Sequence, residues 1–265
     1  MDLGLTGKNA IVSASSEGLG KSCALALVRE GANVVICARR EHKLKEAAQE
    51  LAKRGAGGAR VLPFVCDVTD PEDIKRLVAQ TLSSLGTIHI LVNNAGGPPR
   101  GGFFERSPDD FYETFKLNFM SVVYFCREVI PHMKKQKWGR IINITSVTVK
   151  RPIETLVLSS CIRPGVIALT KILSRELGQY GITVNSVCPG YFLTRPVKNL
   201  IEMQSNLKGL SEEAVMESLT YNIPVGRMGE PEELGALVAF LASEKASYIT
   251  GTAILIDGGS YEGIS

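Results

Sequence analysis

In Ala10-Ile11-Val12-Ser13-Ala14-Ser15-Ser16-Glu17-Gly18-Leu19-Gly20, a short apolar run passes through small polar residues into two glycines and a helix-forming segment. A strand that turns this tightly into a helix presents backbone amides at the helix N-terminus, where they can hold a pyrophosphate. The first candidate dinucleotide-binding residues are therefore Ser13, Ser15, Ser16, Gly18, Leu19 and Gly20. A plain tight turn has the same pattern, so the rest of the chain must decide between the two readings.

Short apolar runs alternate with longer segments of helical period along the whole chain, which is typical of βαβ units. The predicted strands are Ala10–Val12, Asn33–Cys37, Arg60–Val65, Ile88–Val92, Arg140–Ile144, Thr183–Val187 and Ala253–Ile256. The predicted helices are Gly20–Arg29, Glu41–Lys53, Pro71–Leu85, Pro108–Lys135, Pro164–Tyr180 and Pro231–Ala242. Right-handed crossovers then give a Rossmann-type, doubly wound, seven-stranded parallel sheet with helices on both faces, which binds ligands at the carboxyl ends of its strands.

Composition narrows the class of protein. One domain spanning residues 1–265 is expected, and the net charge of +3 is too small and too scattered to indicate nucleic-acid binding. The six cysteines stand singly, without a C-x-x-C pair or a histidine cluster, so no metal site is expected. The N-terminus lacks the form of a signal peptide, and no apolar run approaches a membrane span, so a cytoplasmic location is expected.

One segment breaks the alternation. Pro196–Arg227 is polar and weakly helical in pattern, and it is much longer than a connection between a strand and a helix requires. We expect a mobile flap over the site, at about residues 191–228, rather than a second domain.

Three later motifs strengthen the dinucleotide reading. Cys66-Asp67-Val68-Thr69-Asp70 follows the third predicted strand, Val92-Asn93-Asn94-Ala95-Gly96 ends the fourth, and Asn185-Ser186-Val187-Cys188-Pro189-Gly190 ends the sixth. In order and spacing, nearly the whole chain resembles the classical short-chain dehydrogenases/reductases. The segment Val225-Gly226-Arg227-Met228-Gly229-Glu230-Pro231-Glu232-Glu233-Leu234 is especially similar to the 3-oxoacyl-carrier-protein reductase branch.

This resemblance implies further cofactor contacts. Asp67 and Val68 would contact the adenine, and Asn94, Ala95 and Gly96 would line the central crevice. The residues expected beside the nicotinamide are Pro189, Gly190, Phe192 and Thr194. At the start of the glycine motif the family's Thr-Gly is replaced by Ser13-Ala14, and an alanine at positive φ costs on the order of 1 kcal/mol.

The end of the second strand bears on which nucleotide is bound. NAD-specific family members carry a carboxylate at the position of Ala38, whereas Arg39 and Arg40 follow here and suit a 2′-phosphate. The two arginines also fit a simple helix start, and Glu17 opposes NADP because its carboxylate would face the phosphate unless an arginine intervenes. NADP is the expected cofactor, with NAD as the alternative.

The catalytic positions depart from the family pattern. Asn118 and Ser146 match the family's asparagine and serine, but the tyrosine and lysine positions hold Ser159 and Arg163. Serine does not ionise near neutrality and arginine stays protonated, so this pair cannot relay a proton in the usual way. Arg163 can still offer fixed positive charge to the ribose or to a developing oxyanion.

Two functions fit these residues. The first is an NADP-dependent oxidoreductase acting on a small carbonyl, imine or alcohol substrate, with a proton supplied by Tyr191, Cys161 or water. The alternative is a catalytically silent nucleotide-binding sensor or partner-binding protein. A homo-oligomer is also expected, a tetramer by family resemblance, because Phe111–Lys135 and Pro164–Tyr180 are rich in apolar residues; the same faces could serve only the internal core.

Overall fold

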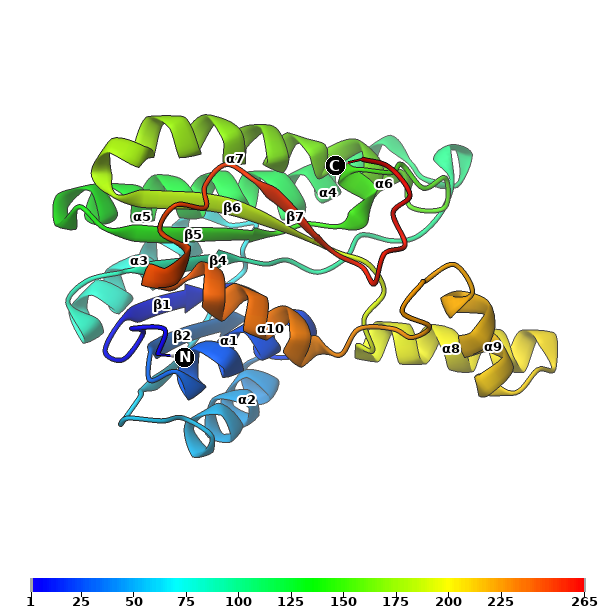
Figure 1. The fold of residues 1–265 in the computed structure, drawn as a ribbon, viewed down its shortest axis with the longest axis horizontal. Coiled ribbons are helices and arrows are strands. Elements are labelled where there is room, and N and C mark those ends of the chain that lie inside the picture. The colour runs from blue at the N-terminus through cyan, green and yellow to red at the C-terminus, as the bar shows by residue number, and fades with distance from the viewer. Residues whose placement is uncertain (1, 265) are drawn as a thin grey trace.

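The computed structural model describes residues 2–264 and shows a seven-stranded parallel sheet (Figure 1). The strands lie in the order β3-β2-β1-β4-β5-β6-β7, and every neighbouring pair is parallel. Their bounds are β1 Asn9–Val12, β2 Asn33–Ala38, β3 Val61–Val65, β4 Ile90–Asn93, β5 Gly139–Ile144, β6 Ile182–Pro189 and β7 Ala253–Ile256. The predicted fold class is confirmed, with strand ends shifted by one or two residues.

Side chains alternate between the two faces of this sheet and separate two apolar cores. Ala10 and Val12 belong to one core, whereas Ile11 between them belongs to the other. The first core contains side chains of α1 (Gly18–Arg29), α2 (Glu41–Lys53) and α10 (Pro231–Leu241). The second contains those of α3 (Pro71–Leu85), α5 (Ser121–Gln136) and α7 (Pro164–Leu177). Helices therefore cover both faces, as the apolar strands require.

The first and last long helices pack directly on one another. Gly235 of α10 lies so close to α1 that a Cβ atom there would stand 2.7 Å from the carbonyl oxygen of Ser22 and 3.2 Å from Cβ of Ala26. Leu27 and Leu234 are completely buried in the same core. A glycine at position 235 is thus required by the close approach of the two helices.

One predicted helix is interrupted and one further helix was not predicted, both at points that concern the site. The single helix expected over Pro108–Lys135 is α4 (Pro108–Phe115), a π-helical turn (Lys116–Met120) and α5. A separate helix, α6 (Val157–Ile162), precedes α7, and Pro164 begins α7 because proline fits the first turn of a helix. A 3₁₀ turn, Gly178–Tyr180, continues α7 to the predicted end.

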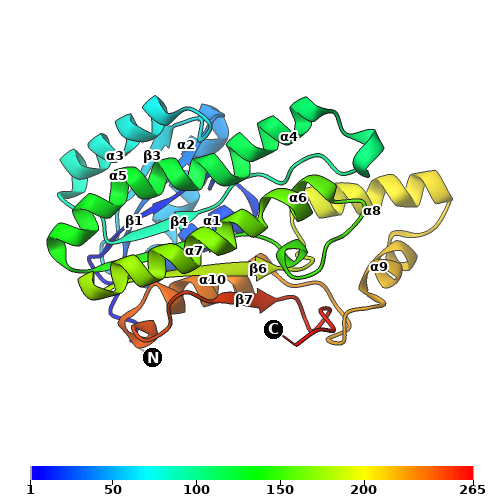
Figure 2. The same ribbon diagram turned by 90° about the horizontal axis from the view of Figure 1, so that it is seen from above.

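The expected flap contains two well-formed helices, so its description as weakly helical was wrong. Helix α8 (Arg195–Lys208) ends at Gly209, which has φ +64, and the Ser211 hydroxyl caps α9 (Glu212–Thr220) by accepting from the Ala214 amide. Both extend away from the sheet (Figures 1 and 2). A small core of their own, Ile201 and Val215 with Met228, holds them together.

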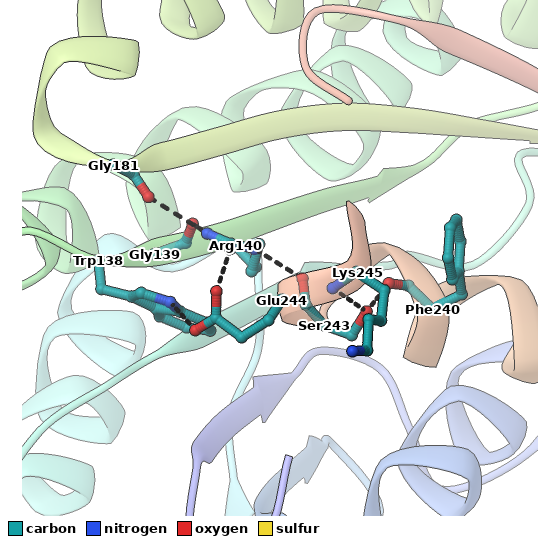
Figure 3. Close-up of polar contacts among 8 residues, drawn as sticks. All are labelled: Trp138, Gly139, Arg140, Gly181, Phe240, Ser243, Glu244 and Lys245. Carbon is teal, nitrogen blue, oxygen red and sulfur yellow. Dashed lines mark hydrogen bonds and ion pairs between the residues drawn. The ribbon is translucent and has the colours of Figure 1, made fainter. Parts of the chain in front are cut away.

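A buried arginine joins β5 to the C-terminal part of the chain, at the edge of the sheet where the strands begin (Figure 3). The Arg140 guanidinium donates to the carbonyls of Ser243, Gly139 and Gly181 and contacts the Glu244 carboxylate at 3.5 Å. It also lies 4.3 Å from the centre of the Trp138 ring. These bonds compensate for the loss of water around a guanidinium that is only 2 % exposed.

The helical stretch Val157–Tyr180 is long and apolar enough to cross a membrane, as core helices of soluble proteins can also be. The sequence-based search for an unbroken apolar run missed it because polar residues and Pro164 interrupt the stretch.

Candidate functional site

A cavity of about 750 Å³ lies at the carboxyl ends of β1 to β4. This volume is in the range of cofactor and drug-sized ligand sites. Among the predicted residues, those that line it are Ser16, Gly18, Leu19, Arg39, Arg40, Asp67, Val68, Asn94, Ala95, Gly96 and Thr194. Ala14, Glu17 and Ala38, which the sequence analysis discussed without assigning them to the site, line it as well. Sequence reasoning did not single out the other residues on its wall, namely Cys66, Gly97, Leu117, Arg195 and Pro196.

The remaining residues of the glycine motif shape the turn instead of lining the cavity. The Ser13 hydroxyl donates to the Asn94 carbonyl at 2.6 Å and accepts from the Asn94 amide at 2.8 Å. The Ser15 hydroxyl donates to the Val12 carbonyl, and a Cβ atom on Gly20 would stand 2.6 Å from the Ala14 carbonyl oxygen. These contacts fix the path of the backbone into α1.

Ala14 and the start of α1 determine how an anion would be received. Ala14 has φ +46, a left-handed conformation that glycine adopts without strain, as its replacement of the family's glycine implied. Glu17 precedes α1, but no side chain caps the helix and no acidic residue lies in its first turn. The first amides of α1 therefore remain open toward the cavity, as an anion site at a helix N-terminus requires.

Three cations converge on the Glu17 carboxylate at the rim of this cavity. Arg40 Nη2 donates to Oε1 at 2.6 Å, Lys43 Nζ donates to Oε2 at 3.3 Å, and Arg195 Nη1 lies 3.9 Å from Oε2. Partial burial by itself would raise the pKa of Glu17, but Lys43 and Arg40 outweigh that effect and hold the pKa below its usual value. Arg39 lines the same cavity and is exposed.

Asp67, which also lines the cavity, is held by a local turn. Its Oδ1 accepts from both the amide and the hydroxyl of Thr69, at 2.9 and 2.8 Å. Burial opposes ionisation, but these two hydrogen bonds and the charge of Arg39 lower the pKa of Asp67 below its usual value. The turn thus presents an ionised carboxylate beside the cavity.

Asn118 lies in the π-helical turn that interrupts α4 and α5. Its Nδ2 donates to the Gly96 carbonyl at 3.1 Å, which ties the turn to the crevice loop. Its Oδ1 is buried and has no hydrogen-bond partner within residues 2–264. Single π-helical turns occur frequently at functional sites. An unpaired buried acceptor here is available to a donor from a ligand or a water molecule.

Ser146 and Ser159 are linked at the end of β5 by Thr148, a residue that sequence reasoning missed. Ser146 Oγ accepts from the Thr148 amide, and Thr148 Oγ1 lies 2.8 Å from Ser159 Oγ. Both members of this hydroxyl pair are buried. The position of Thr148, two residues after Ser146, was the only sequence signal for it. The hydroxyl of Ser159 is therefore engaged with its neighbour.

Arg163 is anchored from one side only. Its Nη1 donates to the carbonyls of Ile144 and Thr145, at 3.1 and 3.0 Å, whereas its buried Nε has no partner in the described part of the chain. Burial lowers the pKa of Arg163 to about 10, slightly opposed by the Cys188 thiol. The guanidinium is thus charged at neutral pH and keeps an unpaired donor for an oxygen atom of a ligand.

The segment after β6 divides into packing and rim residues. Gly190 lies against Asp257, where a Cβ atom would come within 2.8 Å, and the Phe192 ring is buried in the core against Gly229. Pro189 ends β6. Tyr191 lies between Gly190 and Phe192 in the sequence, and its hydroxyl accepts from Arg100 Nη2 at 3.4 Å. This contact joins the start of the flap to the loop after β4.

No group of three or more histidine, cysteine, aspartate or glutamate residues within residues 2–264 is placed to hold a metal ion.

Comparison with known proteins agrees with this arrangement. The family model described as Enoyl-(Acyl carrier protein) reductase matches residues 13–261, almost the entire chain. The chain belongs to the short-chain dehydrogenase/reductase family. Among curated family members, it is 38 % identical to the oxidoreductase UcpA of Salmonella typhimurium over 259 residues, covering 97 % of this chain and 95 % of that protein.

Two solved structures of this family are informative. L-sorbose reductase from Gluconobacter frateurii, complexed with NADPH and L-sorbose, matches with a TM-score of 0.95 and 31 % identity over the full length of both chains. An NADPH-bound short-chain oxidoreductase from Pseudomonas aeruginosa, described as containing an atypical catalytic centre, matches with a TM-score of 0.88 and 29 % identity over 97 % of this chain and 98 % of that one.

Proposed function

We propose that the protein is an NADP(H)-dependent oxidoreductase that interconverts a small carbonyl or imine compound and the corresponding alcohol or amine, with proton delivery that does not use the family's tyrosine and lysine. The chain's membership of an oxidoreductase family and its NADPH-bound structural neighbours support this function over a silent nucleotide sensor. The observation that carries the cofactor assignment is the end of β2, where Ala38 stands at the position of the NAD-specific carboxylate and Arg39 and Arg40 line the cavity beside it.

The residues present fit a dinucleotide. The open amides of α1 suit a pyrophosphate, the cavity is large enough for a nucleotide, and Gly20 is needed by the tight turn. Asp67 and Val68 would hold the adenine, and Arg39 the 2′-phosphate. When bound, the nicotinamide supplies or accepts the hydride.

The chain's own residues would hold and polarise the substrate. Arg163 offers its unpaired Nε to a ribose hydroxyl or to the oxygen that gains negative charge as a carbonyl is reduced. Ser146 and Asn118 are further hydrogen-bonding groups at the same end of the sheet. Ser159, whose hydroxyl is paired with Thr148, contributes to the shape of this wall.

Tyr191 is the phenol we propose for proton transfer. Of the three sources considered, Cys161 is exposed on α6, whereas the Tyr191 hydroxyl already contacts a guanidinium, that of Arg100. Water reaching the same place would be a slower substitute.

NADPH oxidation against a panel of activated ketones, aldehydes and imines tests the activity, with Tyr191→Phe as the variant and Tyr221→Phe, exposed on the flap, as its control. We expect measurable oxidation with at least one substrate, reduced about 100-fold or more by Tyr191→Phe and unchanged by Tyr221→Phe. Equal rates in all three proteins would reject Tyr191 as the donor. Tight NADPH binding without oxidation of any substrate would favour the silent protein.

Binding titrations of NADPH and NADH with the wild type and Arg39→Ala test the cofactor assignment. We expect NADPH to bind more tightly than NADH, with the difference shrinking in the variant. Equal affinities in the wild type, or tighter NADH binding, would reject NADP as the cofactor.

We further propose that the protein is cytoplasmic and forms a homo-oligomer, by family resemblance a tetramer, through α5 and α7. A depression of about 310 Å³ between these helices is lined by Val123, Ile130, Leu169 and Leu173, and Ile172 beside it is 54 % exposed. Apolar side chains gathered on paired helices are typical of isologous interfaces.

A further inference from the structure

The three cations on Glu17 come from separate parts of the chain. Arg40 lies in the turn after β2, Lys43 in the first turn of α2, and Arg195 at the start of α8. Nothing in the local sequence around Glu17 brings these side chains together; the fold does. The Glu17 carboxylate therefore lies at the centre of a positively charged surface formed by these three side chains, and this centre is called the focus below.

This focus coincides with the place where a 2′-phosphate would bind. Glu17, Arg40 and Arg195 line the same cavity as Arg39 and as Ala38, the residue at the end of β2. A phosphate and a carboxylate both present pairs of negative oxygen atoms that match a guanidinium fork. The Glu17 carboxylate and the 2′-phosphate are therefore ligands for the same cations.

NADPH can then bind in only two ways. Either the phosphate displaces Glu17 as the partner of Arg40, Lys43 and Arg195, or it binds beside the ionised Glu17 carboxylate, and the repulsion between the two anions weakens binding. NADH has no charge at this position and meets neither penalty. The pairs on Glu17 are half-exposed and individually weak, so exchange of partners is possible.

We propose that Glu17 is a built-in competitor of the cofactor's 2′-phosphate, and that it determines how strongly the site prefers NADPH over NADH. This inference rests on the proposed function, because it concerns the same nucleotide site. In the free protein Glu17 keeps the cations ordered; in the complex it diminishes the advantage that they give to the phosphate.

Glu17→Gln tests the proposal, because it preserves size and hydrogen bonding while removing the charge. The matched control is Glu50→Gln, which changes net charge equally. Glu50 lies on α2 outside the cavity, and its carboxylate pairs with Lys21 and Arg54. Dissociation constants for NADPH and NADH are measured by calorimetric titration on the wild type and both variants. Adenosine 2′,5′-bisphosphate and adenosine 5′-monophosphate serve as probes of the phosphate alone.

We expect Glu17→Gln to tighten binding of NADPH and of the bisphosphate by about fivefold or more, to change NADH and the monophosphate by less than about twofold, and Glu50→Gln to change neither. Weaker or unchanged NADPH binding in Glu17→Gln would overturn the proposal, as would an equal gain for both nucleotides or the same gain in the control. If the wild type prefers NADPH but the ratio does not move, this inference fails and the proposed function stands. If no protein binds either nucleotide, both fail.

Discussion

Replacing Ala14 by glycine is expected to stabilise the protein. Ala14 has φ +46, and its backbone is held there because its carbonyl accepts from Asn94 Nδ2 at 3.1 Å. The left-handed conformation costs an L-residue about 1–2 kcal/mol. Glycine would remove this cost, but the greater freedom of its unfolded chain would lower the free energy of unfolding by about 0.4–1 kcal/mol. The net effect is a stabilisation of about 1 kcal/mol, or an increase in Tm of about 2–4 °C for a chain of this size.

Thermal and urea unfolding of the wild type and Ala14→Gly measure this difference. Ala79→Gly is the control, because Ala79 is exposed within α3 and glycine at such a position costs about 1 kcal/mol. The same chemical change should therefore have opposite signs at the two positions. NADPH should also bind more tightly to Ala14→Gly, since the methyl group lies on the cavity wall. A destabilised Ala14→Gly would refute the assignment of strain to this turn.

Three other results are expected. The double change Ser159→Tyr plus Arg163→Lys should create or raise ordinary carbonyl reductase activity far more than either single change, because the family's proton transfer needs the tyrosine and the lysine together. Steady-state rates of the wild type, both single variants and the double variant show whether the two changes couple. No gain in a folded, NADPH-binding double variant would mean that the pocket has diverged further. Burial, aided by Lys8, lowers the pKa of His89 to about 4, and its Nδ1 accepts from the Asn9 amide only when neutral. As pH falls, the unfolded state therefore protonates the imidazole before the folded state does, so about 1–3 kcal/mol of stability present above pH ~6.5 is lost as pH falls toward 4. His89→Gln should reduce this pH dependence of the free energy of urea unfolding, and an unchanged dependence would contradict the role of His89. Light scattering at micromolar concentration should give an oligomer, and a monomeric mass would exclude the interface on α5 and α7.

The fold was predictable because its signals are local and repeated. Each strand is an apolar run that ends in a turn, and Asp70 and Ser107 mark helix starts that the structure confirms with side-chain caps. The interruptions were not predictable in this way. The π-helical turn around Asn118 leaves the helical period almost unchanged, so no pattern distinguishes it from continuous helix. Helix α6 was not predicted at all, because six residues are too few to establish a helical period. The helices of the flap bury only a small core, and their weak apolar pattern led to the prediction of a polar, weakly helical flap.

At the candidate site, residue types could be predicted but partners could not. Sequence spacing put Ser159 and Arg163 at the positions that the family fills with tyrosine and lysine, and it identified Ala14 as a strained substitution. It could not show that Thr148 occupies the Ser159 hydroxyl, or that Arg195 reaches Glu17 from a distant segment. Such contacts depend on how loops far apart in sequence meet, which a pattern of residue types does not encode.

The close packing of α10 on α1 has a consequence for the order in which the chain folds. The first helix is made early in synthesis, yet it shares its core with Leu234 and Val238 of α10, which leave the ribosome more than two hundred residues later. Until then the part of α1 that α10 covers stays open to water or to a chaperone, although β1, β2 and α2 pack against other parts of the helix. A larger side chain at Gly235, where the two helices approach closely, would therefore interfere late in folding. It would delay the docking of α10 on a nearly complete molecule while leaving the earlier sheet intact.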